Sequence, residues 1–191
     1  GDWSSDVCSS DLPKTPKPLG YMDQIVVILN MNIFTPEVIG VPISDLTTRE
    51  YNTIIAGIAY GFIDQLGCKE IETCIGDGKD EAELAYDAFT LMISSDPQDN
   101  IAGVIELTEV VKALPGMMTD CRNTKEDIAT IEAWGKNLAA QTDLKAYIQK
   151  KVKRHIIALT ADLAHAKAEY AAGNYFAFGE TLGEMAVIAT L

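Results

Sequence analysis

Apolar residues recur at intervals of three to four positions along most of the chain beyond residue 47. This spacing puts them on one side of an α-helix, as in amphipathic helices that pack around a shared core. No stretch sustains the alternation of apolar and polar residues that is typical of a half-buried β-strand. The pattern predicts an all-α, single-domain bundle of about five to six helices, over approximately residues 47–67, 70–95, 99–121, 123–138, 142–172 and 175–189.

The first predicted helix has a clear start and a pair of glycines with a helical spacing. Thr47 and Glu50 are spaced as in a capping box, where each side chain bonds the main-chain N–H of the other residue. Gly57 and Gly61 lie four positions apart, so they share a helix face and allow a second helix to approach closely. Membrane helix dimers use the same spacing, but no apolar run approaches the roughly 20 residues needed to span a bilayer.

A central antiparallel hairpin is predicted from the segments at about 70–95 and 99–121. The run Ser94-Ser95-Asp96-Pro97-Gln98-Asp99 separates them, and its serine, aspartate and proline residues favour turns and helix starts. The midpoint between Cys74 and Cys121 falls within this run, so two arms of equal length would bring the two cysteines side by side. A disulfide between Cys74 and Cys121 would then tie the base of the hairpin.

The other cysteines leave the pairing open. The chain has four cysteines; Cys8 belongs to a leader segment, and no Cys-x-x-Cys pair indicates zinc. One bridge plus one spare thiol is the simplest interpretation, and it implies an oxidising compartment, either extracellular or in the endomembrane lumen. A bridge between Cys68 and Cys74, or three buried thiols in a cytosolic protein, are the alternatives.

The first 46 residues differ from the helical region, which is expected to form one domain over residues 47–191. Residues 1–12 resemble a translated sequencing-adapter leader, and the proline-rich segment that continues to residue 18 is typical of a solvated linker. Residues 19–46 are expected to form an irregular arm, because prolines and glycine interrupt any regular element there. If residues 1–12 are not native, the true start with any signal peptide is missing from this sequence.

Charge is distributed unevenly along the chain. The 28 acidic and 15 cationic residues give a net charge of −13, which argues against nucleic acid as a partner. Several of the cations are nevertheless concentrated in one segment, which could form a local cationic surface. Such a surface suits an anionic membrane or an acidic partner, and the partner could be the protein's own acidic helices in the same or another copy. Five cations within ten residues form the candidate interaction surface: Lys145, Lys150, Lys151, Lys153 and Arg154.

Four runs of sequence carry a family resemblance: Gly-Phe-Ile-Asp-Gln-Leu-Gly (61–67), Cys-Ile-Gly-Asp (74–77), Leu-Pro-Gly-Met-Met-Thr-Asp-Cys (114–121) and Gly-Asn-Tyr-Phe-Ala-Phe-Gly-Glu-Thr-Leu-Gly (173–183). Over about residues 55–190 the chain resembles a family of small, cysteine-paired, all-helical proteins of ciliates and other unicellular eukaryotes. The resemblance implies a eukaryotic source and a secreted or lumenal setting, and the family has no established activity. Cys68 is extra to the family's cysteine pattern.

The two histidines, His155 and His165, fall on the same predicted helix, where ten residues of separation turn them about 80° apart. They are therefore not expected to share a site. Asp162, His165 and Glu169 do share a face, which is either a metal half-site needing further ligands or, more ordinarily, a solvated polar face. The motifs of serine hydrolases, P-loops, dinucleotide-binding folds and zinc proteases are absent. No catalytic residue, cofactor or metal site is predicted.

Three functions are compatible with the sequence. The favoured hypothesis is a non-enzymatic secreted or lumenal helical protein that acts by binding or assembly, with an unknown protein or with itself. The first alternative is a lipid-binding or membrane-surface protein that exposes an interior rich in methionine and phenylalanine. The second alternative is a hydrolase with an unrecognised acidic site, since paired carboxylates cannot be located from spacing alone.

Overall fold

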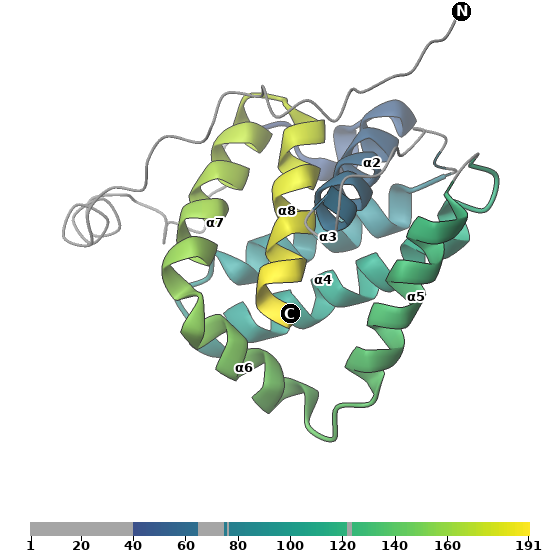
Figure 1. Cartoon of the computed structure of the whole chain (residues 1–191). Coiled ribbons are helices and arrows are strands. Elements are labelled where there is room, and N and C mark those ends of the chain that lie inside the picture. The colour runs from purple at the N-terminus through teal and green to yellow at the C-terminus, as the bar shows by residue number, and fades with distance from the viewer. Residues whose placement is uncertain (1–39, 65–74, 76, 122–123) are drawn as a thin grey trace, which may run out of the picture.

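The computed structural model describes residues 40–64, 75, 77–121 and 124–191. Within these ranges the chain is all-helical and contains no β-strand, which confirms the predicted fold class (Figure 1). A short 3-10 turn, η1 (Ile43–Asp45), precedes seven α-helices: α2 (Thr48–Asp64), α3 (Lys79–Met92), α4 (Pro97–Met117), α5 (Lys125–Ala139), α6 (Leu144–Arg154), α7 (Ile156–Ala171) and α8 (Tyr175–Thr190).

Helices α2 and α8, which are far apart in sequence, form the most extensive helix pair in the described chain. In Figure 1, α8 runs down the middle of the molecule, with α6 and α7 on one side and α5 on the other, while α4 crosses behind it. All seven helices contribute buried side chains to one apolar core. The first and last helices of the bundle therefore form its centre.

Glycines on both helices make the close approach of α2 and α8 possible. A Cβ atom added at Gly57 or Gly61 would overlap the main chain of α8, and one added at Gly179 or Gly183 would overlap the main chain of α2. Main-chain atoms cannot move aside as a flexible side chain can. The close helix neighbour predicted for Gly57 and Gly61 is confirmed, and the partner helix is α8.

The start of α2 is formed by the predicted capping box. The main-chain N–H of Thr47 donates to Glu50 Oε2 at 2.7 Å, and the N–H of Glu50 donates to Thr47 Oγ1 at 3.3 Å. The bond from the Thr47 main chain, together with one from its hydroxyl, holds the pKa of the Glu50 carboxyl below its ordinary value. This reciprocal pair satisfies N–H groups that the first turn of a helix leaves without partners.

The predicted turn between α3 and α4 is also confirmed. Asp96 caps α4 by accepting a hydrogen bond from the N–H of Gln98 at 2.8 Å, and Pro97 occupies the first helical position. The side-chain amide of Asn100 donates to the carbonyl oxygens of Leu91, Met92 and Ser94 at 3.2, 2.9 and 2.8 Å. These bonds tie the end of α3 to the start of α4. Within the described residues α3 begins at Lys79, and most of the predicted earlier part of this arm lies outside them.

The prediction of one long helix over residues 142–172 is wrong, because the chain breaks there into α6 and α7. His155 joins the two helices with φ −111° and ψ 20°, and its N–H is shared between the carbonyls of Lys151 and Val152. This break raises the number of helices from the predicted five to six to seven in the described chain. It also puts His155 at the junction between the two helices, so that only His165 lies within α7.

Polar bonds fix the C-terminal end of α8 to α5 and α6. The indole N–H of Trp134, on α5, donates to Thr190 Oγ1 at 2.9 Å, and the Tyr147 hydroxyl, on α6, donates to the Thr190 main-chain oxygen at 2.8 Å. Trp134 also packs edge-on against Phe62 of α2, with ring centroids 4.9 Å apart. Helices α5 and α6 thus fix the end of α8, the helix that contributes Met185 to the core.

Candidate ligand cavity

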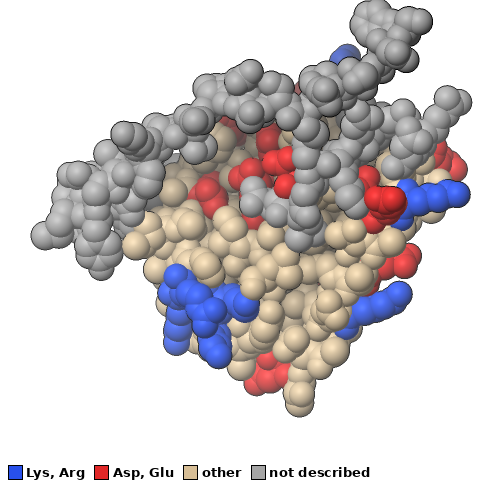
Figure 2. Space-filling view, in the orientation of Figure 1, with Lys and Arg blue, Asp and Glu red and all other residues tan. Residues whose placement is uncertain are grey.

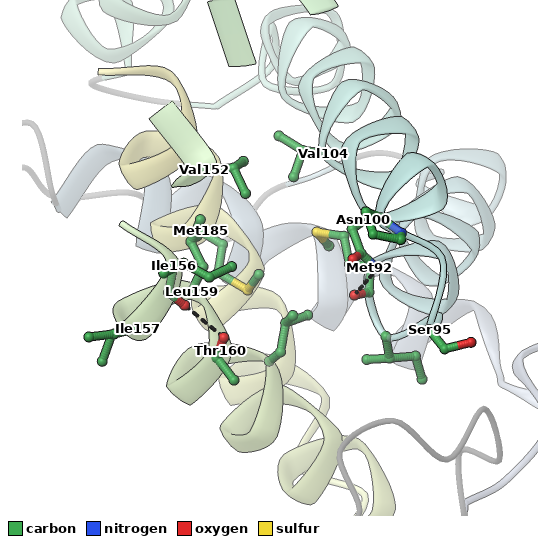
Figure 3. A pocket seen from close by; sticks show the side chains of 13 residues that line it. Met92, Ser95, Asn100, Val104, Val152, Ile156, Ile157, Leu159, Thr160 and Met185 are labelled. Carbon is green, nitrogen blue, oxygen red and sulfur yellow. Dashed lines mark hydrogen bonds between the residues drawn. The ribbon is translucent and has the colours of Figure 1, made fainter. Parts of the chain in front are cut away.

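A cavity of about 490 Å³ lies where the α3–α4 turn faces the α6–α7 junction and α8. Its walls come from five helices and the turn, which lie far apart in the sequence. In Figure 3, residues of the α3–α4 hairpin line one side and residues of α6, α7 and α8 the other. The lining residues are Met92, Ile93, Ser95, Pro97, Asn100, Val104, Val152, Ile156, Ile157, Leu159, Thr160, Leu163 and Met185.

The cavity has a buried apolar floor and an exposed rim. Leu159 and Met185 are 4% and 2% exposed, and Met92 is similarly buried on the opposite wall. Ser95 and Pro97 in the turn are exposed, and Ile156 at the start of α7 is 53% exposed, which is high for a large aliphatic residue. The cavity therefore opens between the α3–α4 turn and the α6–α7 junction.

Polar groups in the inner wall are already engaged within the protein. The amide of Asn100 makes the three bonds that hold the turn, and the Thr160 hydroxyl donates to the Ile156 carbonyl at 2.7 Å. Two of these interactions appear as dashed lines in Figure 3. An apolar cavity whose polar groups are satisfied holds water poorly and accepts apolar molecules. Its interior suits a hydrocarbon group.

None of the residues that line the cavity is acidic, basic or a cysteine. The described wall therefore provides no general acid, general base or nucleophilic thiol, and no carboxylate or imidazole to ligate a metal. Its chemistry is that of a binding site for an apolar group, with the hydroxyl of Ser95 at its rim.

Helix α6 carries the predicted cationic surface next to this opening. Val152 of α6 lines the cavity and is followed in sequence by Lys153 and Arg154. Figure 2 shows basic side chains gathered over the position of α6. We call this surface the α6 cationic face; it consists of Lys145, Lys150, Lys151, Lys153 and Arg154.

Most of the α6 cationic face is not neutralised by the rest of the described chain. Lys151 is partly engaged, because its Nζ lies 5.5 Å from the centre of the Tyr147 ring and bonds the main-chain oxygen of Leu191. Lys145, Lys150, Lys153 and Arg154 are exposed, and none makes an ion pair with a described acidic residue. The acidic helices do not pair with this surface within the described part of the fold.

The polar face predicted from Asp162, His165 and Glu169 is only partly brought together. His165 Nε2 lies 3.2 Å from Glu169 Oε1, and Nδ1 lies 3.0 Å from Thr181 Oγ1, so both ring nitrogens have neighbours. Asp162 is half-buried, and burial raises the pKa of its carboxyl although nearby His165 acts in the opposite direction. No group of three His, Cys, Asp or Glu side chains in the described ranges is arranged to hold a metal ion.

Cys121 follows α4 and is half-buried against the core. No cysteine in the described part of the chain is a free thiol. Cys74 and Cys68 lie outside the described residues, so their pairing stays a prediction.

No helix in the described part of the chain is both long enough and apolar enough to cross a membrane. No protein-family model, curated protein or solved structure matches the chain.

Proposed function

We propose that this protein binds a small amphipathic molecule, with its hydrocarbon portion in the cavity and an anionic group beside α6. The cavity is the observation that carries the proposal. Its volume of about 490 Å³ lies within the roughly 300–1,000 Å³ that is usual for small-molecule sites. The proposal unites the favoured hypothesis, a non-enzymatic binding protein, with the alternative of a lipid-binding protein.

The composition of the wall supports an apolar chain as the buried part of the ligand. A methionine stands on each side of the cavity, Met92 from α3 and Met185 from α8. Methionine side chains are unbranched and flexible, so they adapt to ligands of different length and shape. The ligand class that fits is one with a flexible hydrocarbon chain, such as a fatty acid.

The charge beside the opening supports an anionic head group. Lys153 and Arg154 follow directly after Val152, so their long side chains start within one helical turn of the cavity wall. Neither pairs with an acid in the described chain. A carboxylate or phosphate held at the opening would find charge-assisted hydrogen bonds there.

The hydrolase alternative gains no support from this site, because the described cavity wall carries no carboxylate. Assembly with another copy through the α6 cationic face is a separate possibility, and it does not involve the cavity interior. The buried part of the proposed ligand therefore depends on the cavity, and only its anionic group depends on the α6 cationic face.

Titration of the delipidated full chain with a fluorescent fatty acid tests the proposal. Ile157→Trp would fill the cavity from a half-buried wall position, whereas Ala158→Trp adds the same side chain at the next, exposed position. We expect saturable binding that weakens at least 10-fold in Ile157→Trp and stays within about 2-fold in Ala158→Trp. Absence of saturable binding, or equal losses in both variants, would refute the proposal.

The proposed setting is the extracellular space or an endomembrane lumen, with Cys74 and Cys121 joined by a disulfide. Its support is the absence of a free thiol among the described residues, with Cys121 beside the core. Membership of the family of cysteine-paired helical proteins from unicellular eukaryotes belongs to the same proposal. It is supported by the four sequence runs that carry the resemblance.

A further inference from the structure

We infer that the α6 cationic face docks the protein onto an anionic phospholipid surface and thereby presents the cavity opening to the lipid. The inference rests on the proposed function for the role of the opening. The docking itself depends only on the surface, so the two can fail independently.

Local charge favours an anionic surface despite the net charge of the chain. Helix α6 holds five cations and no acidic residue. At physiological ionic strength, charges are screened over a Debye length of about 8 Å. The surface that touches the lipid therefore decides the interaction, and the excess of acidic residues elsewhere contributes little.

The apolar neighbour of this face distinguishes a lipid surface from an acidic protein as the partner. Ile156, two positions after Arg154, is 53% exposed at the rim of the cavity. Cationic side chains followed closely in sequence by an exposed aliphatic residue match a surface of anionic head groups over hydrocarbon. An acidic protein would satisfy the charges but would need a matching apolar patch to cover Ile156, whereas a lipid surface provides hydrocarbon beneath its head groups everywhere.

Helix α6 can make this contact without leaving the bundle. Its inward residue Ile148 is fully buried, and Tyr147 is bonded to Thr190 at the end of α8. The helix keeps its apolar side in the core and its cations outside. The docking is therefore peripheral and electrostatic, with Ile156 as the residue that reaches the acyl boundary.

Vesicle flotation with matched charge variants tests the docking. The patch variant, Lys150→Gln/Lys153→Gln/Arg154→Gln, and a control variant, Lys79→Gln/Lys125→Gln/Lys136→Gln, each remove three exposed cations. At about 0.1 M salt, where the Debye length is about 10 Å, the unchanged protein should float with vesicles that contain phosphatidylglycerol. It should stay at the bottom of the gradient with vesicles of pure phosphatidylcholine. Three cations at about 1 kcal/mol each correspond to a loss of about 100-fold in partitioning for the patch variant. The control variant should lose less than about 3-fold.

Several results would overturn the inference. They are no flotation at about 0.1 M salt, flotation that survives 0.5 M salt unchanged, or equal losses in the patch and control variants. Salt-sensitive self-association that disappears in the patch variant, without flotation, would instead assign this face to contacts between copies. Fatty-acid titration of the unchanged protein in vesicle-free buffer separates the two proposals. If the protein binds fatty acid saturably but does not float with the vesicles, only the docking is refuted.

Discussion

Gly61 of α2 lies directly against the main chain of Glu180 in α8, so closely that a methyl group on Gly61 would overlap the Glu180 carbonyl oxygen. Gly57 meets α8 in the same way one turn earlier. The contact sets the position of α8, and α8 supplies Met185 to the cavity. The geometry of the proposed binding site therefore depends on the packing of two glycine-bearing helices.

Replacing Gly61 with alanine should destabilise the protein. Because the obstacle is main chain on the neighbouring helix, relief requires a shift of α8, and overpacking of this kind costs about 1–3 kcal/mol or more. Gly116→Ala is the matched control, because an added Cβ at Gly116 in α4 would meet no neighbouring atom within 4 Å. That change should be neutral or should stabilise the protein by up to about 1 kcal/mol. Urea unfolding of both variants provides the comparison; a neutral Gly61→Ala would contradict the described packing.

The bond from Trp134 to Thr190 should contribute measurably to stability. Thr190→Val keeps the shape of the side chain but leaves the buried indole N–H without its acceptor, at a cost of about 1–3 kcal/mol. Thr130→Val removes a hydroxyl that donates to the Glu126 carbonyl at the surface, so it should cost less than about 0.5 kcal/mol. Thermal unfolding followed by circular dichroism compares the two; equal melting temperatures would show that the bond contributes nothing.

Reduction should destabilise the protein if Cys74 and Cys121 are bonded. The bridge would close a loop of 47 residues (121 − 74), which corresponds to about 3–4 kcal/mol in the chain-entropy model. Without reductant, alkylation followed by peptide mass mapping should label Cys68 and leave Cys74 and Cys121 unlabelled. Labelling of Cys121 with Cys68 and Cys74 protected would favour the alternative bridge. Labelling of Cys74 and Cys121 together would remove the argument for an oxidising compartment.

Asp162 should make stability depend on pH. Burial raises the pKa of its carboxyl above the ordinary value of 3.8, opposed by nearby His165. The folded state therefore binds a proton more tightly than the unfolded state. This stabilisation is complete below pH 3.8 and is lost as the pH rises through the raised pKa. Asp162→Asn should accordingly raise the melting temperature at pH 7. In this variant the melting temperature should also fall less steeply as the pH rises above 3.8.

The neighbours of Asp162 define the control for this measurement. Glu180, on α8, also has a raised pKa, chiefly from burial and then from Glu184 and Asp64, so part of the pH dependence should survive in Asp162→Asn. Asp87→Asn, at an exposed position on α3, should leave the slope unchanged. A lower melting temperature for Asp162→Asn at pH 7 would show that the charged carboxylate is stabilised by its surroundings.

Local features of the fold could be predicted because their physical causes are local. The capping box of Thr47 and Glu50 and the turn before Pro97 each depend on a few adjacent residues. The break at His155 could not be predicted in this way, because apolar residues continue at helical spacing through Val152, Ile156 and Leu159. Nothing in that pattern marks the boundary, which depends on tertiary packing: α6 contacts both α4 and α8, whereas α7 packs chiefly on α8.

The cavity could not be predicted from the sequence for a related reason. It is space between side chains of different helices, and Met92, Val104, Leu159 and Met185 show only the ordinary periodicity of core residues. The cationic cluster was predictable because its members are close in sequence. Its position beside an opening was not, since that depends on how the α6–α7 junction faces the α3–α4 turn.

NMR of the full chain with ¹³C-labelled methionine methyl groups tests the central claim, that the cavity binds an apolar chain. Met92 and Met185 line the cavity, whereas Met117 and Met118 lie at the end of α4 outside its wall. On titration with a saturated fatty acid, the account predicts saturable shifts of the Met92 and Met185 signals, with Met117 and Met118 unchanged. Saturable binding that leaves Met92 and Met185 unmoved, or equal shifts at all four methionines, would contradict it.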